Sequence, residues 1–229
     1  MELLANNLAN ASSRGYKADR EVYNLYSSAD ATDPNTGDVP QQPWINAGWV
    51  DFTQGTVQPT GNPLDVALAG KGFLSARGPN GILYTRNGTL RITPQGELVG
   101  PEDRAILDTK DQPVKLDPSK AINIDSTGTI MQEGQPVAQL AIMEFPKPAS
   151  LVKFGESYFD SPDKTTNAPV ASTSTEILQG RAEESNAGPA EAAVRLVSVL
   201  RQFEMLQKAV SIGSDMNKQA IAEIAKVAQ

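Results

Sequence analysis

The 229-residue chain contains neither cysteine nor histidine. Without cysteine it can form no disulfide, no thiolate metal site and no cysteine nucleophile. Without histidine it has no Ser-His-Asp triad, no imidazole acid or base and no ordinary zinc centre. We therefore expect no cofactor, no metal and no catalytic residue, because any catalysis would have to rest on carboxylates, lysines or hydroxyls.

Aromatic residues, positive charge and long apolar runs are also scarce. Aromatics make up 6% of the chain and hydrophobic residues 39%, which predicts a small core for this length. The net charge of −7 argues against nucleic acid as a partner, since nucleic-acid binding needs a basic face. No apolar run approaches the roughly 20 residues of a membrane-spanning helix. No basic segment followed by an apolar core opens the chain, so we expect no cleaved signal peptide.

Proline is confined to the middle of the chain, where all 16 prolines lie between Pro34 and Pro189. Because proline breaks helix interiors, the two ends are predicted to be helical or extended and the middle to consist of strands and turns. The predicted fold is a mainly β central domain, sandwich or barrel-like, flanked by N- and C-terminal helices that pair in a coiled-coil-like inner domain. The predicted divisions are an N-terminal helix (1–15), an extended arm (16–59), an all-β outer domain (60–184) and a C-terminal helix (185–229).

The C-terminal segment carries the strongest helical pattern. Pro189 suits the first helical position, and Glu191 lies near the positive end of the helix. A heptad pattern predicts a seam that another helix covers. The alternative is packing on the chain's own domain, for which about 60 Å of helix is longer than a small β domain needs. The two sets of seam positions are Leu196, Phe203, Val210, Asn217 and Ile224, and Val199, Leu206, Gly213, Ala220 and Val227.

The N-terminal segment offers a possible partner for that seam. Leu4 and Leu8 follow helical spacing. Asn6, Asn7 and Asn10 weaken the helix, because asparagine side chains compete for backbone hydrogen bonds. A helix this short is marginal in water, so we expect it to order only when a partner packs on it.

Turn signals recur every eight to twelve residues from about Leu64 to Gly180, which is typical of an all-β domain. Asn87-Gly88 predicts a hairpin between residues 83–86 and 89–93, and Thr127-Gly128 echoes it. In the arm, three aromatic residues either anchor it on another surface or belong to a small core of their own. These aromatic residues are Trp44, Trp49 and Phe52.

Candidate chemical sites are weak. The carboxylate pairs Glu102/Asp103 and Glu183/Glu184 are expected to be solvated, as adjacent acidic residues in a turn-rich acidic domain usually are. A glycosidase would need two carboxylates held across a cleft. Asp33–Asp38 lacks the ligand spacing and closing glutamate of a calcium loop. Gly70-Lys71-Gly72 does not match a phosphate-binding loop.

Several stretches together resemble the bacterial flagellar rod and hook proteins, in the order in which that family has them and over nearly the whole chain. The arginine-led stretch of the C-terminal helix, Arg201–Met205 with Gln207-Lys208, looks most like the proximal-rod member next to the distal rod. The distal-rod protein is the second choice, and the hook protein is disfavoured by the short middle domain. The other stretches are Ala5–Asn10, Gly15–Lys17, Thr60–Leu68, Gly70 with Gly72-Phe73, Tyr84–Gly88, Gly96, Leu98-Val99, Gln139–Ile142, Phe145, Leu151, Lys153, Gly155, Gln179-Gly180, Glu183, Ser185-Asn186, Pro189 and Glu191.

The resemblance implies a structural subunit of the flagellar basal body that transmits torque and assembles helically, with the terminal helices forming an inner tube and the β domain outside. It implies other rod and hook subunits and the flagellar export apparatus as partners, with no nucleic acid and no small-molecule substrate. It also implies export without a cleaved signal, to the part of the rod that spans the periplasm.

The helical seams define the expected assembly interface. Asn217 either fixes helix register, as buried asparagines do in coiled coils, or is a solvated break in the seam. A β-domain adhesin or phage-tail-like fibre protein and a carboxylate-dependent hydrolase remain as alternatives of other classes. The expected interface residues are Leu4, Asn6, Asn7, Leu8, Asn10, Leu196, Val199, Phe203, Leu206, Val210, Asn217, Ile224 and Val227.

Overall fold

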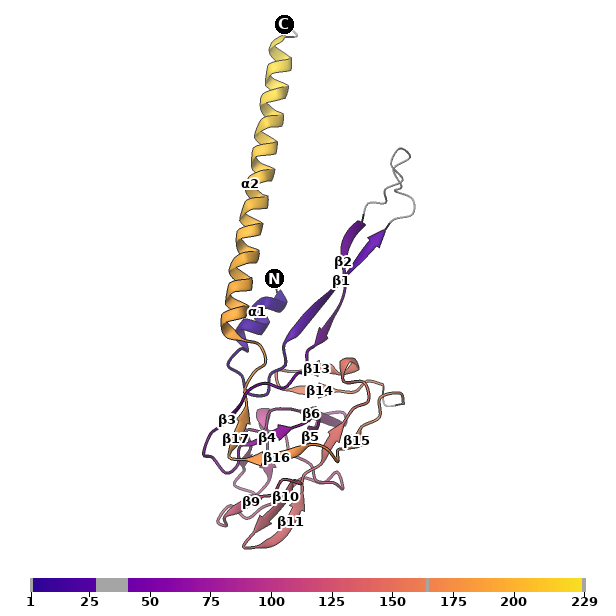
Figure 1. The fold of residues 1–229 in the computed structure, drawn as a ribbon, viewed down its shortest axis with the longest axis vertical. Coiled ribbons are helices and arrows are strands. Elements are labelled where there is room, and N and C mark those ends of the chain that lie inside the picture. Colours follow the sequence, from indigo (N-terminus) through magenta and orange to yellow (C-terminus); the bar gives the residue numbers. More distant parts are fainter. Residues whose placement is uncertain (1, 28–40, 164, 228–229) are drawn as a thin grey trace.

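The computed structural model describes residues 2–27, 41–163 and 165–227, and for 22–27, 41–47 and 220–227 it describes the backbone alone. The chain is elongated (Figure 1): a β domain lies at one end, a long helix projects from it, and a two-stranded ribbon rises beside that helix. No helix of the described part has the length and apolar character needed to cross a membrane. The projecting elements are α1 (Glu2–Ala9), β1 (Asp19–Ser27), β2 (Gln41–Val50) and α2 (Pro189–Val227).

The predicted C-terminal helix is confirmed from Pro189 to Val227. Pro189 occupies its first turn, where the missing N–H has no partner to lose. The N–H of Ala192 donates to the carbonyl of Gly188 (2.9 Å), which closes the first turn on a glycine cap. Glu191 adds a negative charge at the positive end of the helix and lies 3.5 Å from Arg195 one turn later.

A six-stranded antiparallel sheet forms the largest part of the β domain, in the order β13-β14-β6-β5-β12-β15. Its inner side chains pack with those of neighbouring short strands into one core, in which Leu74, Ile106 and Ile130 are fully buried. The strands of this sheet are β5 (Phe73–Arg77), β6 (Ile82–Thr85), β12 (Ile142–Glu144), β13 (Val152–Phe154), β14 (Tyr158–Asp160) and β15 (Val170–Ala171).

Four smaller antiparallel sheets complete the β domain, in the orders β11-β10-β9, β16-β4, β17-β3 and β7-β8. The mainly β prediction is therefore confirmed. The barrel-like form is wrong, because the described strands make several small open sheets and no closed one. The sandwich form stays a prediction. These strands are β3 (Val57–Pro59), β4 (Val66–Ala69), β7 (Arg91–Ile92), β8 (Leu98–Val99), β9 (Ile122–Ile124), β10 (Thr129–Gln132), β11 (Gln135–Gln139), β16 (Glu176–Gln179) and β17 (Arg181–Glu183).

The predicted hairpin at Asn87-Gly88 is wrong. Strand β6 pairs with β5 and β14, and not with β7. The glycine is there for close approach: a Cβ on Gly88 would lie 1.9 Å from the carbonyl oxygen of Val66. Asn87 instead accepts a hydrogen bond from the N–H of Thr89 (3.0 Å), which turns the chain out of β6. The echo of this motif at Gly128 does lie in a hairpin, between β9 and β10.

In the described parts of the predicted arm, two strands pair with one another. Strands β1 and β2 form an antiparallel ribbon, whose pairing the sequence pattern did not predict. At its base Phe52 packs edge-to-face against Phe73 (5.4 Å between ring centroids) and Phe159 (5.0 Å), so it belongs to a core. Trp49 is 39% exposed, whereas the side chain of Trp44 lies outside the described residues.

Candidate assembly interface

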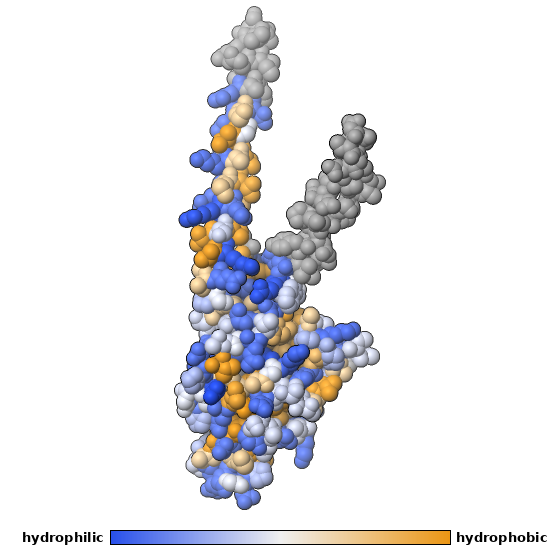
Figure 2. All heavy atoms as spheres, viewed as in Figure 1, coloured by the Kyte–Doolittle hydropathy of each residue, from blue (hydrophilic) through white to orange (hydrophobic). Residues whose placement is uncertain are grey.

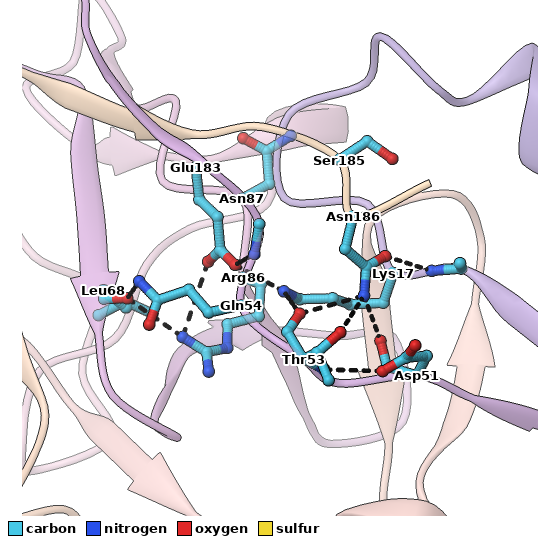
Figure 3. Close-up of polar contacts among 12 residues, drawn as sticks. Lys17, Asp51, Thr53, Gln54, Leu68, Arg86, Asn87, Glu183, Ser185 and Asn186 are labelled. Atoms are coloured by element: carbon cyan, nitrogen blue, oxygen red, sulfur yellow. Dashed lines mark hydrogen bonds and ion pairs between the residues drawn. The ribbon is translucent and has the colours of Figure 1, made fainter. Parts of the chain in front are cut away.

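Three chain segments run side by side between the β domain and the terminal helices. They comprise residues 15–19, 51–56 and 183–187, which we call the neck (Figure 3). The neck is where the motifs at both ends of the chain come together. Its backbone hydrogen bonds run from Gly15 N to Glu183 O (2.7 Å), from Asp51 N to Ala18 O (2.8 Å), from Glu184 N to Thr56 O (2.9 Å) and from Asn186 N to Tyr16 O (3.4 Å).

A buried ion pair lies at the centre of the neck. The ammonium of Lys17 is 2.5 Å from Oε1 of Glu183, and neither side chain is exposed to solvent. Lys17 also donates to the carbonyl of Thr53 (2.8 Å), and the N–H of Gly55 donates to the same carboxylate oxygen (2.9 Å). Arg86 of the β domain approaches the other oxygen, Oε2, at 3.7 Å (Figure 3).

Burial makes this cluster electrostatically costly. It lowers the pKa of Lys17, and the negative charge of Glu183 opposes that shift. Burial likewise lowers the pKa of Arg86, again opposed by Glu183. The guanidinium also lies over the ring of Phe73 at 5.1 Å. Among the described residues, Nε of Arg86 and Oε2 of Glu183 have no hydrogen-bond partner. Desolvation of such groups generally outweighs their mutual attraction, so stability alone does not explain them.

Asn186 links the other two segments of the neck. Its carbonyl oxygen accepts from the N–H of Ala18 (2.7 Å), and its amide nitrogen donates to the carbonyl of Asp51 (2.7 Å). The carboxylate of Asp51 lies 2.6 Å from Arg20. Although burial acts to raise the pKa of Asp51, hydrogen bonds from Thr53 and Arg20 lower it overall. One side chain just before α2 therefore holds the base of the ribbon.

Helix α1 is attached to the same neck. Asn7 is buried and pairs with the backbone of Asp19, donating to its carbonyl (2.8 Å) and accepting from its N–H (2.9 Å). The hydroxyl of Tyr16 donates to Asn7 (3.1 Å), and burial together with the nearby Asp19 raises the pKa of that tyrosine. Lys153 of β13 lies 2.8 Å from Asp19 and 4.2 Å from the Tyr16 ring.

A cleft of about 530 Å³ lies between α1, the base of β1 and the beginning of α2. Helix α1 contributes Leu3 and Leu4 to its walls, and the α2 residues that line it all lie between Gly188 and Gln202. Among the described residues, the two terminal helices approach one another near the start of α2. The coiled-coil pairing expected from the seam stays a prediction.

The expected interface residues fall into two groups along the helices. Near the neck, Asn7 is buried and its hydrogen bonds lie within the chain, whereas Leu4, Leu8, Asn10, Leu196 and Val199 are half-buried and Asn6 is exposed. Beyond the neck, every residue from Arg201 to Gln219 is exposed, including Asn217. Apolar side chains gather along this projecting helix (Figure 2). Phe203, Leu206 and Val210 are 55%, 65% and 73% exposed, and the side chains of Ile224 and Val227 lie outside the described residues.

The neck residues were absent from the residues predicted to be functional. Glu183 was expected to be solvated and is instead fully buried, because Lys17 and Arg86 flank it. No sequence spacing connects these residues, since 166 positions separate Lys17 from Glu183. The one available signal was that all three lie in the motif stretches. The other pair, Glu102 and Asp103, is exposed as expected. Among the described residues, no cluster of three or more acidic side chains is arranged to hold a metal ion.

Two family models match the chain. Residues 67–132 match the D1 domain of the flagellar hook protein FlgE/F/G, and residues 178–223 match the C-terminal region of the flagellar basal body rod FlgEFG proteins. The first match lies within the β domain, and the second covers the C-terminal part of the neck and most of α2.

Curated relatives cover nearly the whole chain. The flagellar basal-body rod protein FlgF of Caulobacter vibrioides is 25% identical over 229 residues, which is 99% of this chain and 92% of the relative. The FlgG protein of the same organism is 30% identical over 242 residues, covering 94% of this chain and 90% of the relative. FlgG of Buchnera aphidicola subsp. Schizaphis graminum is also 30% identical, over 245 residues and with the same coverage. These comparisons give no support to the adhesin, fibre or hydrolase alternatives. The chain belongs to the family of flagellar basal-body rod proteins.

Proposed function

We propose that this structural rod subunit is a proximal-rod protein of the FlgF type, and that it assembles helically into the shaft that transmits torque. The inner part of the shaft would consist of residues 1–15 and 185–229, with the arm (16–59) and the β domain (60–184) outside. Other rod and hook subunits are its partners, and the flagellar export apparatus delivers it without cleaving a signal. No nucleic acid and no small molecule takes part.

The exposed apolar side chains of α2 carry this proposal. Phe203, Leu206 and Val210 lie on the predicted seam and are all more than half exposed. Burying a side chain of this size contributes about 1.5–3 kcal/mol. In a single chain these side chains stay in contact with water, whereas packing between subunits would bury them and stabilise the assembly. A contact of one surface with a different surface of the next copy does not close on itself, and therefore builds a filament.

A second apolar strip on α2 favours contact with more than one neighbouring helix. Met205, Ala209, Ile212 and Met216 follow one another at spacings of four, three and four residues, and all four are exposed. At 100° per residue this strip lies about a third of a turn around the helix from the seam. A helix that is apolar on two faces suits the interior of a multi-helix tube better than a single pair.

The FlgG relatives have the higher identity, 30% against 25%, but the alignment lengths favour the FlgF type. The FlgF alignment spans 229 positions and 99% of this chain, so it needs few gaps. The FlgG alignment spans 242 positions, more than the whole chain, so that relative has segments with no counterpart here. We therefore expect this gene to restore swimming to a strain that lacks its FlgF-type protein and to fail in a strain that lacks its FlgG-type protein. The opposite pattern would assign the chain to the distal rod.

The assembly surface is tested by a matched pair of substitutions in a strain whose own copy has been deleted. Leu206→Glu places a charge on the seam, whereas Gln207→Glu places the same charge one residue away. Both positions are exposed, so both variants should unfold within about 0.5 kcal/mol of the wild type. We expect Leu206→Glu to abolish swimming and rod formation seen by electron microscopy, and Gln207→Glu to retain both. Normal rods with Leu206→Glu would refute the assembly role of the seam.

Asn217 tests whether the seam fixes helix register. In a buried seam position asparagine selects one alignment at some cost in stability. Asn217→Leu should therefore give rods of irregular length or lattice, visible in purified basal bodies. Regular rods from this variant would mean that Asn217 is a solvated break in the seam.

A further inference from the structure

Charges of alternating sign run through the three segments of the neck and the residues next to them. Arg86 faces Glu183, Glu183 faces Lys17, and Lys17 lies in the field of Asp51, which pairs with Arg20. Lys17 belongs to the first segment, Asp51 to the second and Glu183 to the third. The alternation therefore depends on how the three segments are aligned along one another.

Any slip of the first segment against the third destroys this alternation. A slip of one residue would put Tyr16 or Ala18 in the place of Lys17, and neither of them carries an ammonium. A slip of two residues would bring one of the next residues along the chain to that place. Such a slip would put either Gly15 or Asp19 opposite Glu183. Gly15 leaves the buried carboxylate without its ammonium, and Asp19 buries two carboxylates together, which is strongly unfavourable.

The backbone hydrogen bonds do not provide the same discrimination. Among the described residues, two backbone hydrogen bonds join the first segment to the third, from Gly15 N to Glu183 O and from Asn186 N to Tyr16 O. Buried ion pairs contribute little net stability, and fixing a register is the best-attested use of buried polar groups. Only five residues separate Glu183 from Pro189, so the register of the neck is passed directly to the start of α2.

We propose that Lys17, Glu183 and Arg86 are positioning residues that hold the neck in one register and thereby fix the direction in which α2 leaves the β domain. The three residues act on α2 through the backbone of the neck. Their role concerns the single chain, before any contact with another subunit, and it goes beyond the proposed place of the chain in the rod.

Nitroxide labels can measure this direction on the full-length chain, because it has no native cysteine. Val137 on β11 and Val197 in the first turns of α2 are both 47% exposed. Each can therefore be replaced by a cysteine that carries a label. Pulsed electron–electron double resonance then gives the distribution of distances between the label on the β domain and the label on α2. We expect one narrow distribution for the wild type, and at least a twofold wider or a two-component distribution for Lys17→Met and Glu183→Gln.

Three further variants separate positioning from stability. Ile130→Ala weakens the β core without touching the neck, so it should lower the urea midpoint and leave the distance distribution unchanged. Lys120→Met removes an exposed ion pair with Glu133, and it should change neither the urea midpoint nor the distance distribution. The triple variant Lys17→Met/Arg86→Met/Glu183→Met removes the charges without leaving any of them unpaired, and remains informative if a single variant fails to fold. It should widen the distribution.

The positioning role would be overturned if the triple variant, or both single variants, gave a distance distribution as narrow as that of the wild type. Because the measurement uses the free chain, that result would leave the rod assignment standing. Conversely, failure of the complementation experiments would leave this inference untouched.

Discussion

Asn7 and Asp19 pair as two neighbouring strand residues do, although one lies in a helix. The side-chain amide of Asn7 supplies a donor and an acceptor to the carbonyl and N–H of Asp19, at 2.8 and 2.9 Å. Asparagine is a poor helix former because its side chain competes for backbone groups. Here the same property attaches α1 to the first residue of β1, so a residue that weakens the helix in isolation holds it in the folded chain.

The Asn7→Ala variant should detach α1 from the neck. Leaving buried backbone groups without partners costs about 1–3 kcal/mol, and the better helix propensity of alanine returns no more than about 0.7 kcal/mol. We expect a net loss of about 1–2 kcal/mol in urea unfolding, with faster amide exchange at Asp19. Asn10→Ala is the control, because the Asn10 side chain bonds only within the helix and its end. Equal losses in the two variants would contradict this assignment.

Two glycine substitutions should act in opposite directions. In Gly88→Ala the new methyl group would lie 1.9 Å from the Val66 carbonyl oxygen, so the segment around residue 88 must move away from β4. Overpacking of this kind costs about 3 kcal/mol, which should appear as a lower urea midpoint. Gly213→Ala lies in α2 with nothing within 4 Å, and removing a helix glycine favours the helix by about 1 kcal/mol. Its helix content by circular dichroism should rise. Tolerance of Gly88→Ala would refute the close-approach explanation.

Amide hydrogen exchange should be graded along α2 in the free chain. From Pro189 to Val199 the helix contacts the neck and α1, whereas every described side chain from Arg201 onward is exposed up to Gln219. Helices without tertiary packing are marginal in water. We expect slow exchange in the first three turns, rapid exchange beyond about Gln202 and strong protection of the β domain. Uniform protection along the whole helix would mean that α2 is already covered in a stable oligomer.

Acid should destabilise the chain partly through Glu144. Its carboxylate accepts hydrogen bonds from Ser172, Ser174 and Thr175, and these lower its pKa, with Ser172 the largest contributor. A carboxyl whose folded pKa is depressed stabilises the fold above its unfolded pKa of about 4.3, and that stability is lost as the pH falls through the folded value. Glu144→Gln should therefore show a shallower fall of unfolding free energy below about pH 4. Parallel curves for variant and wild type would exclude this contribution.

The long helix could be predicted from the sequence because its determinants are local. Pro189 begins it, and the heptad spacing then continues without a second proline to the end of the described residues. The β domain could be predicted only as a class. The hairpin at Asn87-Gly88 failed because a glycine required by a close backbone contact with Val66 has the same sequence appearance as one required by a turn.

The neck could not be predicted at all as a site. Its residues are ordinary charged and amide side chains, and their pairing depends on which distant segments the fold brings together. Lys17 and Arg86 carry the same charge and lie on either side of one carboxylate, which no linear pattern indicates. The pairing of β1 with β2 was missed for a related reason, since 13 positions separate the end of β1 at Ser27 from the start of β2 at Gln41.

The 166-residue separation of Lys17 and Glu183 has a consequence for the order of events during synthesis. The ribosome releases Lys17 early and Glu183 only after the entire β domain. An ammonium that becomes completely buried in the folded chain therefore stays hydrated while a further 166 of the 229 residues, nearly three-quarters of the polypeptide, are made. Closing so long a loop is slow compared with forming local contacts. The neck therefore forms late, because Lys17 of a nascent chain cannot meet Glu183 before the whole β domain has been synthesised.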